Sequence, residues 1–192
     1  PGLRFLALPL AYAFHAGLGL FFLCRAEGLP LRQLATRLAP GAHGRSLAWG
    51  VAFLGLAVTA VVAVALLSGP LLRPSQSPQR ELVELVTSLG GLKTMLPVVF
   101  TLAILAPCFE ETMFRGCLLP WLGKRIGWAW ALVASSLCFG AMHLQPAGLP
   151  TLSTLGFVLG LAFLRTRNLL TSILVHGLWN GAVFALLRVI LA

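Results

Sequence analysis

Apolar residues fill this chain in long runs, and short polar connections separate the runs. A helix rises about 1.5 Å per residue, so roughly 20 apolar residues cross a hydrocarbon layer of about 30 Å. Six runs reach or approach this length, and we predict one membrane span for each: 5–24, 47–67, 95–119, 128–144, 150–164 and 169–190. The pattern therefore predicts an all-α fold, a polytopic transmembrane helical bundle of about six spans.

The connection at 78–90 has a different pattern. Ser77 and Pro78 form a helix start, because Ser caps helices and Pro fits the first helical position. The following apolar residues recur with the spacing of one helix face: Leu82, Leu85, Val86 and Leu89. This segment predicts an amphipathic helix that lies at the membrane interface or covers a site as a lid. Its modest length favours the interface.

Composition supports the membrane assignment. The chain has 192 residues, 58% of them hydrophobic and only 10% charged, and a water-soluble domain of this size could not bury so much apolar surface. The net charge of +9 does not indicate nucleic-acid binding, because the basic residues form no continuous stripe. Anionic lipid headgroups explain these charges better. The four Cys residues form no CxxC pair, so we interpret them as packing residues.

The basic residues also predict an orientation in an integral, multi-pass membrane protein. The connections after the first, third and fifth predicted spans hold eight Lys and Arg residues, and the opposite side holds five. Cytoplasmic connections carry the excess of positive charge. Both termini are therefore predicted to lie outside the cytoplasm.

Three charged residues interrupt the apolar run 95–119, namely Glu110, Glu111 and Arg115. Each charge inside a membrane span costs about 2.5–3.5 kcal/mol on the lenient insertion scale, so function is the default explanation. Glu111 and Arg115 stand at positions i and i+4, which places them on one helix face where they can pair. Glu110 points about 100° away around the helix, and a carboxylate facing an apolar interior suits a general base or acid.

Other polar residues have the same helical spacing. His176 and Asn180 stand at i and i+4 on the last span, and Phe139 and His143 repeat this spacing on the fourth. With ordinary helix tilts, their depths allow these residues and Glu110 to meet near the middle of the membrane. A purely structural role remains open for Glu111 with Arg115, whose ion pair can simply hold helices together. A structural role alone is less favoured for the four other polar residues, because placing them in membrane spans without a function would be costly. They are Glu110, His143, His176 and Asn180.

These residues resemble three motifs of the CPBP family, which comprises type II CAAX prenyl endopeptidases and the bacterial Abi and bacteriocin-processing relatives. Glu110-Glu111-Thr-Met-Phe-Arg115 resembles its EExxxR motif, Phe139-xxx-His143 its FxxxH motif, and His176-Gly-Leu-Trp-Asn180 its HxxxN motif. The likeness covers about 95–190, in the family's order, and implies a four-span catalytic core at 94–192. The segment 1–93 would add two N-terminal spans. The bacterial relatives imply a prokaryotic cytoplasmic membrane.

The resemblance implies an intramembrane endopeptidase. Glu110 and His143 would activate a water molecule, His176 and Asn180 would stabilise the oxyanion, and Glu111 with Arg115 would hold the site, with Phe139 as a further supporting residue. We expect no metal cofactor, because Asn180 suits an oxyanion donor better than a zinc ligand. Zinc is the alternative, bound by Glu110, His143 and His176, although HExxH is absent.

The sequence leaves the substrate and the oligomeric state open. A prenylated CAAX-type peptide, a peptide leader or a C-terminal sorting tail could each enter such a site from the bilayer. A different function is also open, in which the chain is a non-catalytic immunity or scaffold protein and these polar residues only pack helices. A proton or ion pathway is less favoured, because the acidic residues in the spans are confined to one of them.

Overall fold

A computed structural model describes residues 17, 43–69 and 80–191 of the chain. Apart from Gly17, the first predicted span at 5–24 lies outside the described residues. Each element of the described part is a helix. In chain order they are α3 (His43–Ser68), α4 (Arg80–Ser88), α5 (Leu92–Phe100), the π-helical η3 (Thr101–Leu105), α6 (Ala106–Glu111), the π-helical η4 (Thr112–Leu118), α7 (Leu119–Ile126), α8 (Trp128–Met142), the 3-10 turn η5 (Pro146–Gly148), α9 (Leu149–Thr166) and α10 (Leu169–Ile190).

The predicted all-α polytopic bundle is confirmed. Four helices are long and apolar enough to cross a membrane, at Ala48–Ser68, Leu92–Ile126, Pro146–Thr166 and Leu169–Ile190. They correspond to the second, third, fifth and sixth predicted spans. The fourth corresponds to the shorter apolar helix α8. It ends at Met142, two residues before the predicted end, because Pro146 forces Gln145 before it into an extended conformation.

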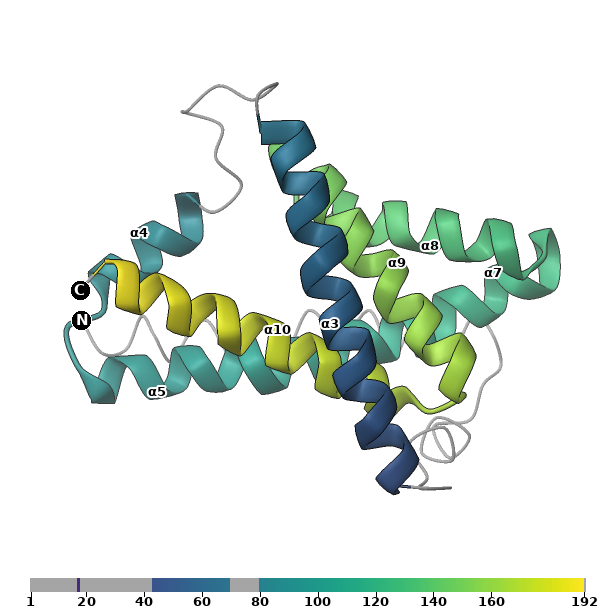
Figure 1. The fold of residues 1–192 in the computed structure, drawn as a ribbon, viewed down its shortest axis with the longest axis horizontal. Coiled ribbons are helices and arrows are strands. Elements are labelled where there is room, and N and C mark those ends of the chain that lie inside the picture. Colours follow the sequence, from purple (N-terminus) through teal and green to yellow (C-terminus); the bar gives the residue numbers. More distant parts are fainter. Residues whose placement is uncertain (1–16, 18–42, 70–79, 192) are drawn as a thin grey trace.

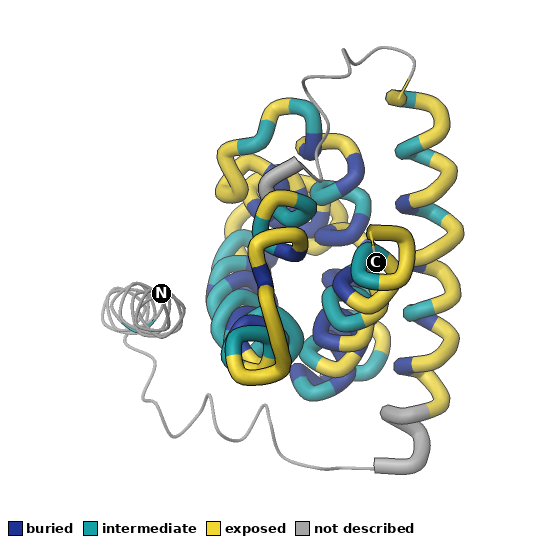
Figure 2. The backbone as a smooth tube through the Cα atoms, turned by 90° about the vertical axis from the view of Figure 1, so that its left-hand side faces the viewer, coloured by how far each residue is buried: buried dark blue, intermediate teal, exposed yellow. Residues whose placement is uncertain are grey.

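The long helix from α5 to α7 is the axis of the bundle. Helix α10 lies beside its first half, in contact with η3 and α6 (Figure 1). Helices α8 and α9 pack on each other around the second half. Helix α3 crosses α9 and α10, and Figure 2 shows it at one edge of the bundle with many exposed residues along it.

Two prolines explain why the long helix is irregular. Pro107 and Pro120 have no backbone N–H, and a proline ring clashes with the carbonyl one turn earlier. In both places the helix widens before the proline: the N–H of Ala106 donates to the Thr101 carbonyl, and that of Leu119 to the Phe114 carbonyl, each five residues back. The interruption at Pro107 therefore takes the form of a π-helical stretch in a continuous helix.

The amphipathic segment forms helix α4, which ends at Ser88, two residues before the predicted end, while residues 78 and 79 lie outside the described part. Its apolar face does not point outward. Val86 and Leu89 are buried against Val98 of α5 and Phe184 of α10. Packing against the bundle therefore holds α4 in place, and its polar side remains at the surface.

Glycines let the last two spans approach their neighbours closely, as small residues commonly do between membrane helices. A Cβ at Gly160 would collide with the Leu132 side chain of α8. A Cβ at Gly177 would collide with the backbone carbonyl of Ala103 in η3, an atom that cannot move aside without displacing the helix. Gly177 therefore sets how closely α10 approaches the π-helical stretch.

This contact predicts the effect of one substitution. Gly177→Ala should lower the unfolding free energy by about 1–3 kcal/mol, because overpacking forces the backbones apart. The matched control is Gly55→Ala in α3, where a Cβ meets nothing within 4 Å. The control should leave stability unchanged or raise it by up to about 1 kcal/mol. Unfolding in detergent micelles measures both, and equal stability of the two variants would contradict the packing described.

Candidate active site

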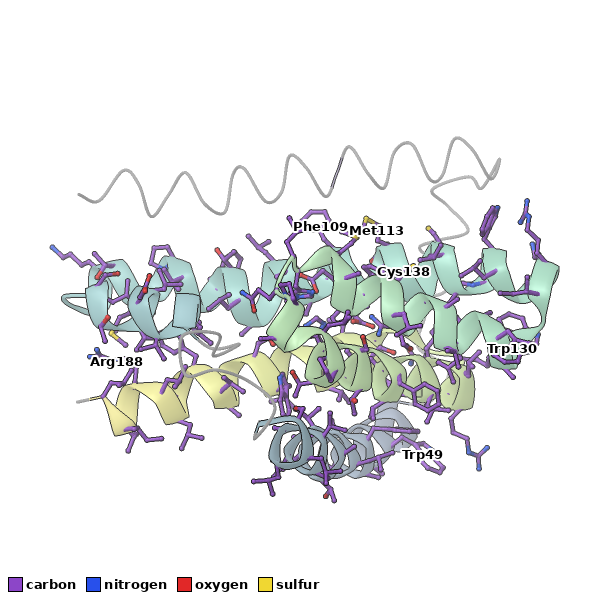
Figure 3. The ribbon with its side chains drawn as sticks, turned by 90° about the horizontal axis from the view of Figure 1, so that it is seen from above. Trp49, Phe109, Met113, Trp130, Cys138 and Arg188 are labelled. Atoms are coloured by element: carbon purple, nitrogen blue, oxygen red, sulfur yellow. The ribbon has the colours of Figure 1, made fainter. Side chains whose placement is uncertain are left out.

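A buried carboxylate stands at the centre of the charged stretch. Glu111 is 0% exposed, and its Oε1 accepts a hydrogen bond from Nη1 of Arg115 at 2.8 Å. This is the pair that the i, i+4 spacing predicts. Phe109 and Met113 of the same helix point the other way, toward the side of the bundle opposite α3 (Figure 3).

Arg115 connects this helix to two others. Its guanidinium donates through Nη2 to the backbone carbonyl of Gly156 in α9 at 2.6 Å. The same group lies over the Phe139 ring of α8, with Cζ 4.8 Å from the ring centroid. Arg115 is 1% exposed, and a charge buried this deeply is stable only when several partners satisfy it. Here a carboxylate, a carbonyl and an aromatic face share that role.

His176 of α10 completes the buried cluster. Its Nδ1 lies 2.9 Å from Glu111 Oε1, and because a carboxylate oxygen accepts, Nδ1 carries the proton and donates it. The hydrogen bond fixes the ring and leaves Nε2 directed at the neighbouring carboxylate, 3.8 Å from Oε2 of Glu110. That distance is too long for a direct hydrogen bond. The geometry thus gathers Glu110, Glu111, Arg115 and His176.

The charges in this cluster are close to balance. Two carboxylates face one guanidinium, which leaves one negative charge if His176 is neutral and none if it is an imidazolium. In a low-dielectric interior such a balance matters far more than at a surface. Glu110 is the more accessible carboxylate, since its side chain is 15% exposed while that of Glu111 is 0% exposed.

His143 lies at the exposed end of α8, beyond the last helical residue. The predicted span placed it inside a helix, whereas the helix ends before it. Its Nδ1 lies 2.8 Å from the Phe139 carbonyl, which can only accept, so Nδ1 is again the protonated nitrogen. In a neutral ring Nε2 is then the proton acceptor. The Phe139 ring, 5.0 Å away between centroids, lies between His143 and the buried cluster.

Phe139 joins the parts of the site. It is 0% exposed, and its ring contacts His176 edge-on with the centroids 5.6 Å apart, in addition to Arg115 and His143. The backbone at Gly156 approaches the ring so closely that a Cβ there would lie 3.1 Å from it. The sequence marked Phe139 only as a supporting residue, because its spacing to His143 gives no sign of these other contacts.

Asn180 lies one turn beyond His176 on α10, and its amide binds backbone. Nδ2 donates to the carbonyl of Leu102 in η3 at 2.9 Å. The sequence predicted neither this acceptor nor the Gly156 carbonyl that Arg115 binds. Pro107 is the signal that could have indicated the first, since a proline inside a helix deprives an earlier carbonyl of its donor.

The three candidate zinc ligands do not form a metal site in this structure. Among the described residues no group of three or more His, Cys, Asp and Glu side chains has the arrangement needed to hold a metal ion. The residues therefore do not fit a three-ligand zinc centre as they are placed.

A buried carboxylate, histidine and arginine inside spans of membrane length define a polytopic membrane protein with a polar site within its bundle. Residues 92–182 match the family model of Rce1-like proteins, the type II CAAX prenyl endopeptidases. The match confirms the predicted resemblance to this family, and the chain is an integral membrane protein.

A relative from Escherichia coli, an uncharacterized 24.3 kDa protein, is 38% identical over 99 residues. The match covers 47% of this chain and 46% of that protein, so the chain spans about half the length of the curated relative it matches. No solved structure gives a significant match.

The cluster predicts how Arg115 contributes to stability. Arg115→Met leaves the Glu111 carboxylate buried without its cation, so the unfolding free energy should fall by about 3–5 kcal/mol. Adding Glu111→Gln removes that charge and should recover part of the loss.

Arg125→Met is the control. It removes an exposed arginine of the same long helix, stacked on Trp121, and should cost under about 1 kcal/mol. Unfolding in detergent measures all three variants, and equal effects of Arg115→Met and Arg125→Met would contradict a buried ionic cluster.

Proposed function

We propose that this chain is an intramembrane endopeptidase that hydrolyses a peptide bond of a membrane-associated substrate. The observation that carries this proposal is the contact between Glu110 and His176, whose Oε2 and Nε2 atoms lie 3.8 Å apart within a membrane-length bundle. A carboxylate beside an oriented imidazole can both accept a proton from water and stabilise developing negative charge. The match to a family of endopeptidases supports the same class of reaction.

In the first step Glu110 acts as the general base. It takes a proton from a water molecule while the water oxygen attacks the carbonyl carbon of the substrate. Nε2 of His143, the acceptor nitrogen of its neutral ring, orients the same water. An exposed His143 at the end of α8 suits this role, since catalytic hydrogen bonds often tighten only when substrate is bound.

In the second step the tetrahedral intermediate carries its negative charge on the former carbonyl oxygen. His176 donates to it through Nε2 when the ring is protonated on both nitrogens, and because Glu110 now holds the proton of the water, this positive charge balances the negative charge of the oxyanion. Asn180 offers its second amide N–H. The intermediate then collapses as the C–N bond breaks, and Glu110 returns its proton to the leaving amine.

Glu111 and Arg115 hold His176 in position. Glu111 fixes the tautomer and the orientation of His176, as a carboxylate does for the histidine of a catalytic triad. Arg115 neutralises Glu111 and ties it to α9. Both residues therefore act through His176.

We propose that no metal takes part in this mechanism. The support is the placement of the side chains, because no three His, Cys, Asp and Glu side chains among the described residues are arranged to hold a metal ion. Elemental analysis of active, purified protein tests this assignment, and stoichiometric zinc would overturn it.

We propose substrates that reach the site from the bilayer. The family indicates a prenylated CAAX-type peptide, and a peptide leader or a C-terminal sorting tail has the same access. The alternative function, a non-catalytic immunity or scaffold protein, draws support from the way Arg115 and His176 hold three helices together. In that role the charge of Glu110 would not matter for activity.

One substitution distinguishes the endopeptidase from the non-catalytic protein. Glu110→Gln keeps the size of the side chain and removes the base, so cleavage should fall by about 10²–10⁴-fold. The control Glu84→Gln makes the same change at an exposed position on α4. Mapping of protein termini in membranes of cells that express each form measures cleavage. Termini that appear with wild type and Glu84→Gln, but not with Glu110→Gln, are expected, and identical termini in all three would contradict the proposal.

A further inference from the structure

We infer that Asn180 is a positioning residue: its amide replaces the backbone donor that Pro107 removes from the long helix, and thereby fixes Glu110 and Glu111 opposite His176. The relevance to catalysis rests on the proposed function, whereas the structural part does not. The first step concerns the carbonyl of Leu102. In an α-helix it would accept from Ala106, and in a π-helix from residue 107.

Neither donor reaches Leu102. The N–H of Ala106 donates to Thr101, and Pro107 has no N–H. A carbonyl without a partner is costly in a membrane interior, where water does not satisfy it. Nδ2 of Asn180 supplies the missing donor at 2.9 Å. The side chain of one helix thus completes the backbone of another at the point where the π-helical stretch meets the proline.

The second step concerns register. Asn180 binds on the N-terminal side of Pro107, and His176, one turn away on α10, binds Glu111 on the C-terminal side at 2.9 Å. The two hydrogen bonds therefore hold the irregular helix at both sides of its proline. Between them Gly177 packs on the Ala103 carbonyl, which allows α10 to come close enough for both bonds.

The third step links this register to the site. Glu110 is adjacent to Glu111 in the chain, so the distance between its Oε2 and Nε2 of His176 depends on how the two helices are held. If the Leu102 carbonyl loses its donor, the wide turn before Pro107 loses this hydrogen bond to α10, and the carboxylates can rotate or slide relative to His176. Asn180 acts on the reaction through this geometry, in addition to any contact of its second N–H.

The test is a double-variant cycle. Pro107→Ala returns an N–H five residues after Leu102, so the helix can satisfy that carbonyl itself. Asn180→Ala alone should lower the unfolding temperature by about 4 °C or more and reduce cleavage at least about tenfold, mainly in kcat. In the Pro107→Ala background, Asn180→Ala should cost much less stability, and its effect on cleavage should shrink to the part that comes from the contact of its second N–H with the oxyanion.

Pro97→Ala is the matched control, since Pro97 also lies inside this long helix but its missing N–H does not bear on Leu102. It should not rescue Asn180→Ala. Rescue of stability without any rescue of cleavage would leave the oxyanion contact as the whole effect of Asn180 on the reaction and overturn the positioning role. Equal rescue by Pro97→Ala, or no loss of stability on Asn180→Ala, would overturn the hydrogen bond as its basis. The unfolding measurements test the hydrogen bond even if the wild-type protein cleaves no substrate. A failure of the proposed function would therefore be seen in the cleavage assay alone.

Discussion

The structure depends on the buried carboxylate of Glu111, which accepts hydrogen bonds from an arginine and a histidine. Arg115 and His176 both donate to its Oε1, and the side chain is fully buried. Water cannot replace a lost partner of a carboxylate buried this deeply, so each partner must be held in place. Arg115 is held by the Gly156 carbonyl and the Phe139 ring. The interaction of one carboxylate thereby fixes the relation between α6, α8, α9 and α10.

The irregular backbone of the long helix is stabilised by the same helix, α10, that binds Glu111. A proline normally breaks a helix in water, but inside a bundle its neighbours can satisfy the groups it leaves open. Pro107 lies between the two bonds from α10, and the helix widens before it. The contacts from α10 that accommodate the proline therefore also bring Glu110 close to His176.

Much of the fold was readable in the sequence, because membrane spans depend on length and apolarity alone. The sixth span matches α10 from Leu169 to Ile190. The pairing of Glu111 with Arg115 was also predictable, since both lie on one helix and spacing determines their contact. The first predicted span stays a prediction, because 5–24 lies almost wholly outside the described residues.

The contacts between helices were not readable in the same way. Helical spacing placed His176 and Asn180 on one face, but it could not identify their acceptors, Glu111 and the Leu102 carbonyl. The second acceptor is a backbone group, which carries no residue signal except the nearby Pro107. The exposed position of His143 depends on where α8 ends, and this followed from Pro146 beyond the apolar run. The catalytic roles of Glu110, His143, His176 and Asn180 remain proposals.

The central claim is that Glu111 fixes His176 through Nδ1 and so directs Nε2 toward Glu110. Nitrogen-15 solid-state NMR of histidine-labelled protein in lipid bilayers tests it most directly, with the His176 signals assigned by loss in His176→Ala. We predict a protonated Nδ1 in a strong hydrogen bond, with a shift that changes markedly in Glu111→Gln and little in Glu84→Gln. An unprotonated Nδ1 at His176, or a signal indifferent to Glu111→Gln, would contradict the account.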